Sequence, residues 1–126
     1  MQRPWVRCLL LSAAWFAVLV AIVLWGRGWI RASFGDLAVV PWVIHSVGIV
    51  PVLAPRIVPR VVFGLGLACT LEGLQLLGNV GPDDPLWMHL IFGSTFDPMD
   101  LVHYVVGALV AFGLEHRLVR PTVHRP

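Results

Sequence analysis

The chain has 126 residues, of which 58% are hydrophobic and 13% are charged, and its mean hydropathy is +0.83. These values exclude a soluble globular or disordered protein and indicate an integral membrane protein. The net charge of +2 comes from nine arginines spread along the sequence, so no partner nucleic acid is predicted. We therefore expect an all-α integral membrane protein, because a helix satisfies its own backbone hydrogen bonds in lipid.

Four hydrophobic stretches are predicted to be transmembrane helices, at about residues 6–25, 37–54, 57–77 and 100–118. The first is longer than the apolar part of a signal peptide and ends in Trp25-Gly26-Arg27, so we expect it to be retained. The second contains Pro41 and Pro51, which predict a bent helix because each removes a backbone donor. Residues 85–96 are too short to cross and are predicted to be interfacial or re-entrant. Residues 1–126 thus form a single predicted domain.

The arginines are distributed unevenly between the two sides of this predicted bundle. One side, which holds both termini, carries Arg3, Arg7, Arg56, Arg60, Arg117, Arg120 and Arg125. The other side carries Arg27 and Arg31 together with five aspartates, namely Asp36, Asp83, Asp84, Asp97 and Asp100. Because positive charge favours the cytoplasmic side, the N- and C-termini are predicted to be cytoplasmic. The outer face is therefore predicted to be acidic.

Glu72 lies within the third predicted span, where an ionisable side chain costs roughly 3 kcal/mol. It shares one helix face with Ala68 and Gln75 and lies roughly 7 to 8 Å below the outer end of its span. Two interpretations remain open. Glu72 either hydrogen-bonds neighbouring helices and only determines their packing, or it belongs to a functional site.

Asp97, Pro98 and Asp100 are typical of a helix start. Asp97 is predicted to be the N-cap and Pro98 the first helical residue, while Asp100 stabilises the positive helix end. Asp100 also shares a face with Tyr104, and His103 lies beside them. Small residues lie further along this face and along the Glu72 face, and they allow close packing of helices within the chain or formation of a homo-oligomer. They are Gly64 and Ala68 in the third span and Gly107 and Ala111 in the fourth.

Glu72 and Asp100 are predicted to lie at similar depth, near enough to share a proton, a water or a ligand. Six candidate binding residues follow from this reasoning: Asp36, Glu72, Gln75, Asp100, His103 and Tyr104. Asp36 is also predicted to cap the second helix, and Tyr104 to join Trp25, Trp29 and Trp87 in an aromatic belt at the span ends.

No metal site, no cofactor and no catalytic residue is assigned. Cys8 and Cys69 lie at different depths, so they are not expected to pair, and neither has histidines at metal-ligand spacing. His45, deep in the second span, is predicted to bond a carbonyl that a proline leaves free, with proton relay as the alternative.

The order of short motifs provides a resemblance. Gly35-Asp36, then Glu72 and Gln75 in an E-x-x-Q motif, precede a G-x-x-F-x-x-x-D-x-x-x-Y-x-x-G pattern that runs from Gly93 to Gly107. This order resembles an uncharacterised family of small bacterial membrane proteins, a domain of unknown function, over about eighty residues from Arg27. The resemblance implies a multi-pass protein of the bacterial inner membrane and implies no activity. A more distant similarity is to VanZ-like proteins, which are associated with glycopeptide resistance.

Three functions remain open. The first is a membrane protein whose acidic outer cluster binds a cationic or hydroxylated group of a membrane lipid or small molecule. The second is an enzyme acting on a lipid-linked substrate, with Glu72 or Asp100 as general base and His103 as proton partner. The third is a subunit of a proton-coupled carrier, which requires His45 to face the same cavity as Glu72.

Overall fold

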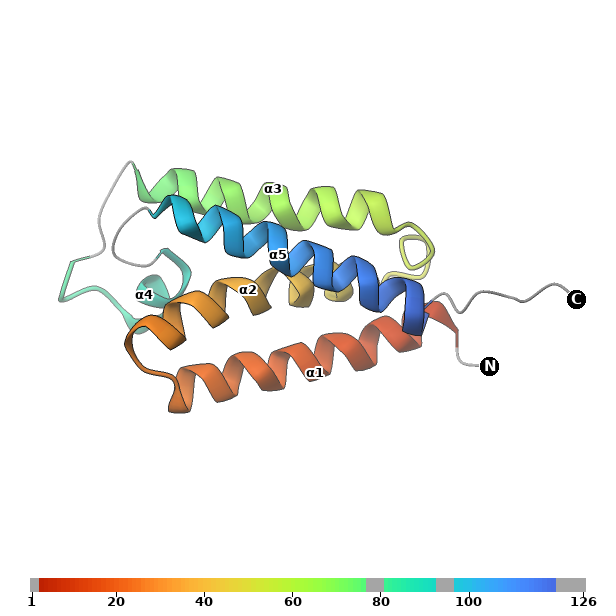
Figure 1. Cartoon of the computed structure of the whole chain (residues 1–126), viewed down its shortest axis with the longest axis horizontal. Coiled ribbons are helices and arrows are strands. Elements are labelled where there is room, and N and C mark those ends of the chain that lie inside the picture. The colour runs from red at the N-terminus through yellow and green to blue at the C-terminus, as the bar shows by residue number, and fades with distance from the viewer. Residues whose placement is uncertain (1–2, 77–80, 93–96, 120–126) are drawn as a thin grey trace, which may run out of the picture.

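The computed structural model describes residues 3–76, 81–92 and 97–119, and these residues are helical with short connections. The elements are α1 (Pro4–Trp25), α2 (Gly28–Val47), α3 (Ile57–Gln75), α4 (Leu86–Phe92), α5 (Pro98–Leu114) and a π-helix, η1 (Glu115–Val119). The four long helices lie side by side, with α1 and α3 at the edges and α2 and α5 between them (Figure 1). The described part of the chain is therefore a helical bundle, and all-α is the observed fold class.

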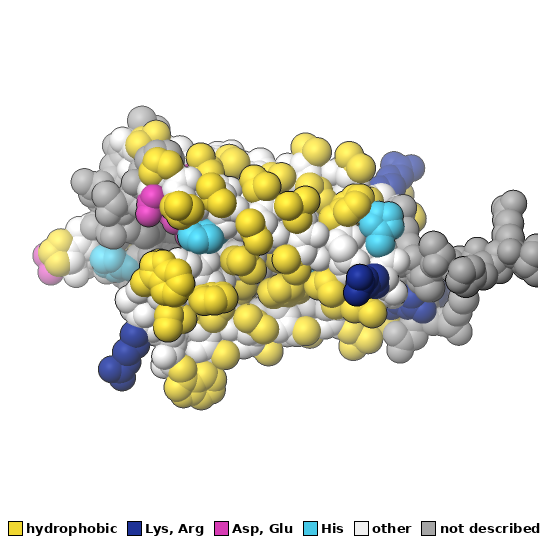
Figure 2. Space-filling model, in the orientation of Figure 1, with side chains coloured by type: hydrophobic (Ala, Val, Ile, Leu, Met, Phe, Trp, Pro, Cys, Tyr) yellow, Lys and Arg dark blue, Asp and Glu magenta, His cyan; other side chains and the backbone are white. Residues whose placement is uncertain are grey.

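Within the described residues, three helices are long and apolar enough to cross a membrane: Pro4–Trp25, Ile57–Gln75 and the continuous helical stretch Pro98–Val119. Their outer surfaces are apolar, since Leu24, Val62 and Leu109 are each 65% exposed. Figure 2 shows hydrophobic side chains over the middle of one face, with arginines at its two ends. This distribution suggests a membrane protein, in agreement with the composition.

The helix at the second predicted span differs from the expectation of 37–54. Helix α2 begins at Gly28 and ends at Val47, and the residues that follow form turns. The N-cap residue is Arg27, so the prediction that Asp36 caps this helix is wrong. Gly28 has a φ of 55°, which glycine adopts without strain, and this lets the chain reverse directly after α1. Asp36 consequently lies inside α2, more than two turns from its start.

The two prolines of this region have different effects. Pro51 lies in the turns beyond α2 and bends no helix, and the Val47 carbonyl accepts a bond from the Val50 N–H at 3.2 Å. Pro41 lies inside α2 and leaves the Leu37 carbonyl without its usual N–H donor. This carbonyl faces Gly107 of α5, where any Cβ would collide with it. Pro41 and Gly107 together therefore allow α2 and α5 to approach closely.

The small residues of α3 and α5 are used inside the chain. Gly64 lies against Ile44 of α2, where an added Cβ would come within 2.9 Å of the Ile44 side chain. The core around it is formed by Val40, Ile44, Ile57, Ala68, Tyr104, Ala108 and Ala111. The sequence also allows four small residues to contact a second copy of the chain. In the structure, contacts within one chain bury all four: Gly64, Ala68, Gly107 and Ala111.

The start of α5 agrees with the prediction from its sequence. Asp97 is the N-cap, and its Oδ1 accepts a bond from the Met99 N–H at 2.9 Å. Pro98 is the first helical residue and Asp100 lies in the first turn. Helix α4 falls within the segment 85–96 that is predicted to be interfacial, and residues 93–96 lie outside the described part.

The opposite end of the bundle contains a buried ion pair that the sequence analysis does not predict. Arg60 of α3 and Glu115 of η1 form a salt bridge, and both side chains are fully buried. Arg60 also donates to the carbonyls of Ala54 at 2.9 Å and Ile44 at 3.4 Å. At the same end, Arg7 of α1 donates to the Leu118 carbonyl at 2.6 Å. These contacts join the start of α1, the start of α3 and the end of η1.

Candidate functional site

Glu72 connects α3 to the start of α5. Its side chain is 1% exposed, and its Oε2 accepts a bond from the Tyr104 hydroxyl at 3.0 Å. Its Oε1 accepts a longer bond of 3.4 Å from the Asp97 backbone N–H. Glu72 is therefore turned inward to partners on a neighbouring helix, as an ionisable residue in an apolar helix requires.

Tyr104 does not belong to an aromatic belt. Its side chain is 6% exposed, in the core between α2, α3 and α5, and its hydroxyl donates to Glu72. Trp25, Trp29 and Trp87, by contrast, are exposed. The prediction of a belt position fails for Tyr104, because nearness to a helix end does not show which way a side chain points.

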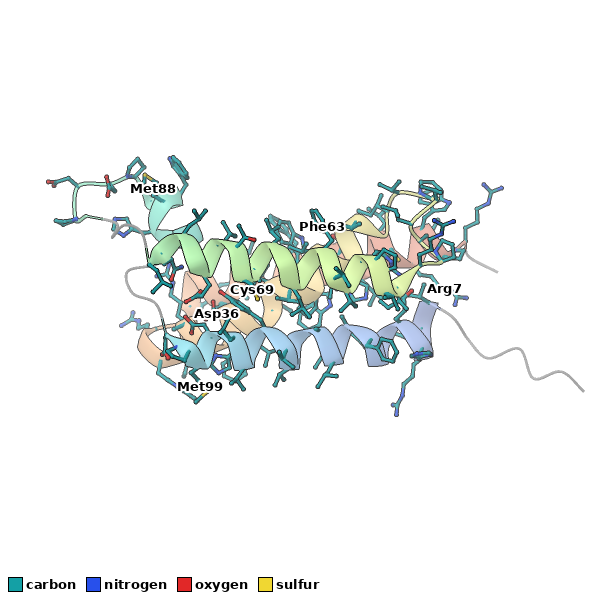
Figure 3. The ribbon with its side chains drawn as sticks, turned by 90° about the horizontal axis from the view of Figure 1, so that it is seen from above. Arg7, Asp36, Phe63, Cys69, Met88 and Met99 are labelled. Atoms are coloured by element: carbon teal, nitrogen blue, oxygen red, sulfur yellow. The ribbon has the colours of Figure 1, made fainter. Side chains whose placement is uncertain are left out.

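Asp36, Asp100 and His103 come together between α2 and α5. One carboxylate oxygen of each aspartate and one ring nitrogen of the histidine lie within 4.8 Å of one another. In the view of Figure 3, Asp36 of α2 appears between the ribbons of α3 and α5, near the end of the bundle that holds Met99 of the first turn of α5. The sequence analysis does not predict this arrangement, because it expects the second helix to begin at residue 37. Asp36 is therefore expected at a helix end, whereas it lies two turns inside α2.

A cavity of about 1120 Å³ opens beside these side chains. Its apolar walls come from α1, α2 and α3, and include Phe16, Leu19, Ile22, Val23, Val39, Trp42, Val43, Leu67 and Leu71. Its polar lining includes every candidate binding residue except His103, namely Asp36, Glu72, Gln75, Asp100 and Tyr104, together with Arg31, His89 and Asp97. The structure thus brings the predicted candidates to one place.

No arginine in the described part of the chain forms an ion pair with the carboxyl groups at the polar end. Among the described residues the one salt bridge is Arg60–Glu115, at the other end of the bundle. Arg31 lines the cavity but forms no ion pair with Asp36 or Asp100. Several carboxyl groups near an apolar cavity are costly unless a cation or protons compensate their charge. The polar end is therefore suited to a ligand that supplies positive charge or hydrogen-bond donors.

His45 lies away from this cavity. It is fully buried in α2, its Nδ1 donates to the Pro41 carbonyl at 2.8 Å, and it is absent from the cavity lining. The carbonyl that Pro41 frees is that of Leu37, so the prediction that His45 bonds a freed carbonyl is wrong. The condition for the carrier hypothesis, that His45 faces the Glu72 cavity, is not met.

Comparison with known proteins places the chain in a family. A protein-family model described as "Protein of unknown function (DUF2809)" matches residues 25–108. The chain belongs to this family. The DUF2809 match begins at the end of α1 and ends in α5, so it covers all six candidate residues. It confirms the resemblance to an uncharacterised domain of unknown function.

No curated protein and no solved structure matches this DUF2809 chain. The family description names no activity.

Proposed function

We propose that the chain is a binding protein of the bacterial inner membrane that accepts an amphiphile with a cationic or hydroxylated head group. The observation that carries this proposal is a single cavity whose apolar walls lead to carboxyl groups that have no arginine partner among the described residues. A hydrocarbon chain fits between α1, α2 and α3. The head group then meets Asp36, Glu72 and Asp100 at the polar end.

The cavity has the size and the chemistry of a ligand site. Small-molecule pockets usually measure about 300 to 1,000 Å³ and combine apolar walls with a few polar groups. The volume of about 1120 Å³ is at the upper end of this range and accommodates a long-chain molecule. Head groups that donate hydrogen bonds are favoured, because ionised carboxylates accept bonds and donate none.

Three compounds with the same alkyl chain and different head groups test this proposal: dodecylamine, dodecanol and dodecanoate. We expect binding to decrease in that order, as measured by native mass spectrometry of the purified full-length chain in detergent. Asp100→Asn should weaken amine binding roughly tenfold, the value of one charge-assisted hydrogen bond of about 1.5 kcal/mol, and leave dodecanol nearly unchanged.

Asp83→Asn is the matched control for this assay. Asp83 is exposed, lies in the connection before α4 and does not line the cavity. This variant should bind the three compounds as the wild type does. Equal affinity of the wild type for amine and carboxylate would reject the proposal.

The proposed membrane arrangement has four crossings, with α2 as the fourth and both termini in the cytoplasm. The supporting observations are the three apolar helices, the side-by-side position of α2 and the excess of arginine on the side of the termini. Exposed Trp25 and Trp29 mark the opposite interface, at the turn between α1 and α2.

Reporter fusions test this arrangement. A green fluorescent protein fused after Pro126 should fluoresce, because it folds in the cytoplasm, and alkaline phosphatase at the same position should be inactive. Alkaline phosphatase inserted at Asp83, in the connection between α3 and α4, should be active. Active phosphatase at the C-terminus would require an odd number of crossings or the reverse orientation.

A second candidate is an enzyme that acts on a lipid-linked substrate, as the distant resemblance to VanZ-like proteins implies. The observation in its favour is that Glu72 and Asp100 line the same cavity, with His103 next to Asp100. Glu72 or Asp100 would then act as general base. Incubation with a bacterial lipid extract separates the two functions, since an enzyme changes the mass of the lipid that it binds.

A further inference from the structure

We propose that Asp36, Asp100 and His103 bind one divalent transition-metal ion, Zn²⁺ or Mn²⁺, at the polar end of the cavity. The proposal extends the proposed function, with which it shares this end of the cavity. It assigns the three residues between α2 and α5 to the ion, and leaves the Glu72 side to the head group of the amphiphile.

The geometry suits a metal site. The three donor atoms lie within 4.8 Å of one another. Bonds of 2.0 to 2.2 Å to a common ion would bring such atoms to about 3.4 Å apart in a tetrahedral arrangement. Binding would require side-chain rotations that close this gap, and the two helices that carry the donors are already in contact at Gly107 and Leu37.

The donors are of the right chemical type. Two carboxylates supply two negative charges, which match one divalent ion, and no arginine is paired with either of them among the described residues. The imidazole distinguishes this set from an acidic surface patch. The Nδ1 atom of His103 is buried and has no hydrogen-bond partner in the described part of the chain. Imidazole with carboxylates favours transition ions over Mg²⁺ and Ca²⁺, which prefer oxygen ligands throughout.

The neighbouring groups support a site with an open position. Asp36 and Asp100 line the cavity, so a coordination position of the ion would face it. Glu72 already accepts bonds from Tyr104 and from the Asp97 backbone, which keeps its carboxyl group beside the proposed site without making it a ligand. Once the ion neutralises the two aspartates, Glu72 and Asp97 are the acidic groups of the cavity lining that remain for a donating head group.

Metal binding can be measured on the full-length chain purified in detergent with no added lipid. We expect one equivalent of Zn²⁺ or Mn²⁺ to bind, with no displacement by a large excess of Mg²⁺. Asp36→Asn, Asp100→Asn and His103→Gln should each weaken binding at least about tenfold, the lower end of the effect seen when groups that merely support metal ligands are changed. The controls Asp83→Asn and His116→Gln should bind as the wild type does, because both residues are exposed and lie apart from the three donors.

Spectroscopy of bound Co²⁺ and chemical modification of His103 test the metal site even if a variant does not fold. Co²⁺ bound to the wild type should give visible absorption bands that shift in His103→Gln, since one nitrogen ligand is lost. If that variant is not folded, protection of His103 from diethylpyrocarbonate by Zn²⁺ in the wild type gives the same information. The proposal is overturned if the wild type binds no stoichiometric ion, or if all three variants bind as it does.

The two proposals can fail separately. Amphiphile binding is measured with EDTA present, and metal binding is measured without lipid. A chain that prefers dodecylamine in the first assay but binds no stoichiometric ion in the second rejects only the metal site. An ion bound with no preference among the amphiphiles rejects only the proposed function.

Discussion

Replacing Arg60 with methionine should destabilise the folded chain by about 3 to 5 kcal/mol, the cost of leaving one member of a buried ion pair without its partner. Arg60 and Glu115 are both fully buried, and the second carboxylate oxygen of Glu115 has no hydrogen-bond partner among the described residues. Removal of Arg60 therefore leaves Glu115 with neither its charge partner nor water. Thermal unfolding in detergent, followed by circular dichroism, measures the effect.

The double variant Arg60→Met with Glu115→Leu should recover most of this stability, because an apolar pair of similar volume replaces the buried charges. Arg56→Met is the control, since Arg56 is exposed and is only one helical turn away from Arg60. A double variant as unstable as the single one would show that the hydrogen bonds from Arg60 to the Ala54 and Ile44 carbonyls matter more than the ion pair.

Gly107→Ala should destabilise the chain by about 1 to 3 kcal/mol, the usual cost of inserting extra volume into a packed interior. An added Cβ would collide with the Leu37 carbonyl oxygen and would lie 3.1 Å from Pro41 Cδ. The Leu37 carbonyl is backbone and Pro41 is rigid, so α5 must move away from α2. The melting temperature in detergent should fall, and metal binding at Asp36 and Asp100 should weaken with it.

Gly113→Ala is the matched control on the same helix. An added Cβ at Gly113 meets nothing within 4 Å, and alanine favours a helix over glycine by about 1 kcal/mol. This variant should be as stable as the wild type or slightly more stable. Equal melting temperatures for the two variants would contradict the close approach of α2 and α5 at Gly107.

Hydropathy alone predicts most of the long helices. Helices α1, α3 and α5 follow predominantly apolar stretches, and the start of α5 is predicted from Asp97 and Pro98. The bounds of α2 are not predicted, for a physical reason. Residues 28–36 mix glycine, arginine and aspartate with aromatic residues, yet they are helical, whereas apolar residues 49–54 form turns around Pro51. Hydropathy indicates which segments avoid water, but it does not indicate which backbone N–H and carbonyl groups form the hydrogen bonds of a helix.

The candidate site is predictable in part. Rise per residue along two helices is sufficient to predict that Glu72 and Asp100 lie at a common depth, and both line one cavity. The approach of Asp36 to Asp100 and His103 depends on the contact of Leu37 with Gly107, a tertiary contact between distant parts of the chain. The Arg60–Glu115 pair depends in the same way on the packing of α3 against the end of the chain. No local sequence pattern predicts either of these two tertiary contacts.

The Arg60–Glu115 pair also constrains the order of assembly during translation. Arg60 leaves the ribosome before Glu115, because α4 and α5 lie between them in the chain. Until η1 has been synthesised, the Arg60 guanidinium group has neutral acceptors within the nascent bundle, namely the Cys8 sulfur and the carbonyls of Ile44, Ala54 and Arg56. Until then, the part of the bundle formed by α1, α2 and α3 holds a cation without its carboxylate partner. The buried ion pair is therefore completed only when η1 has been synthesised.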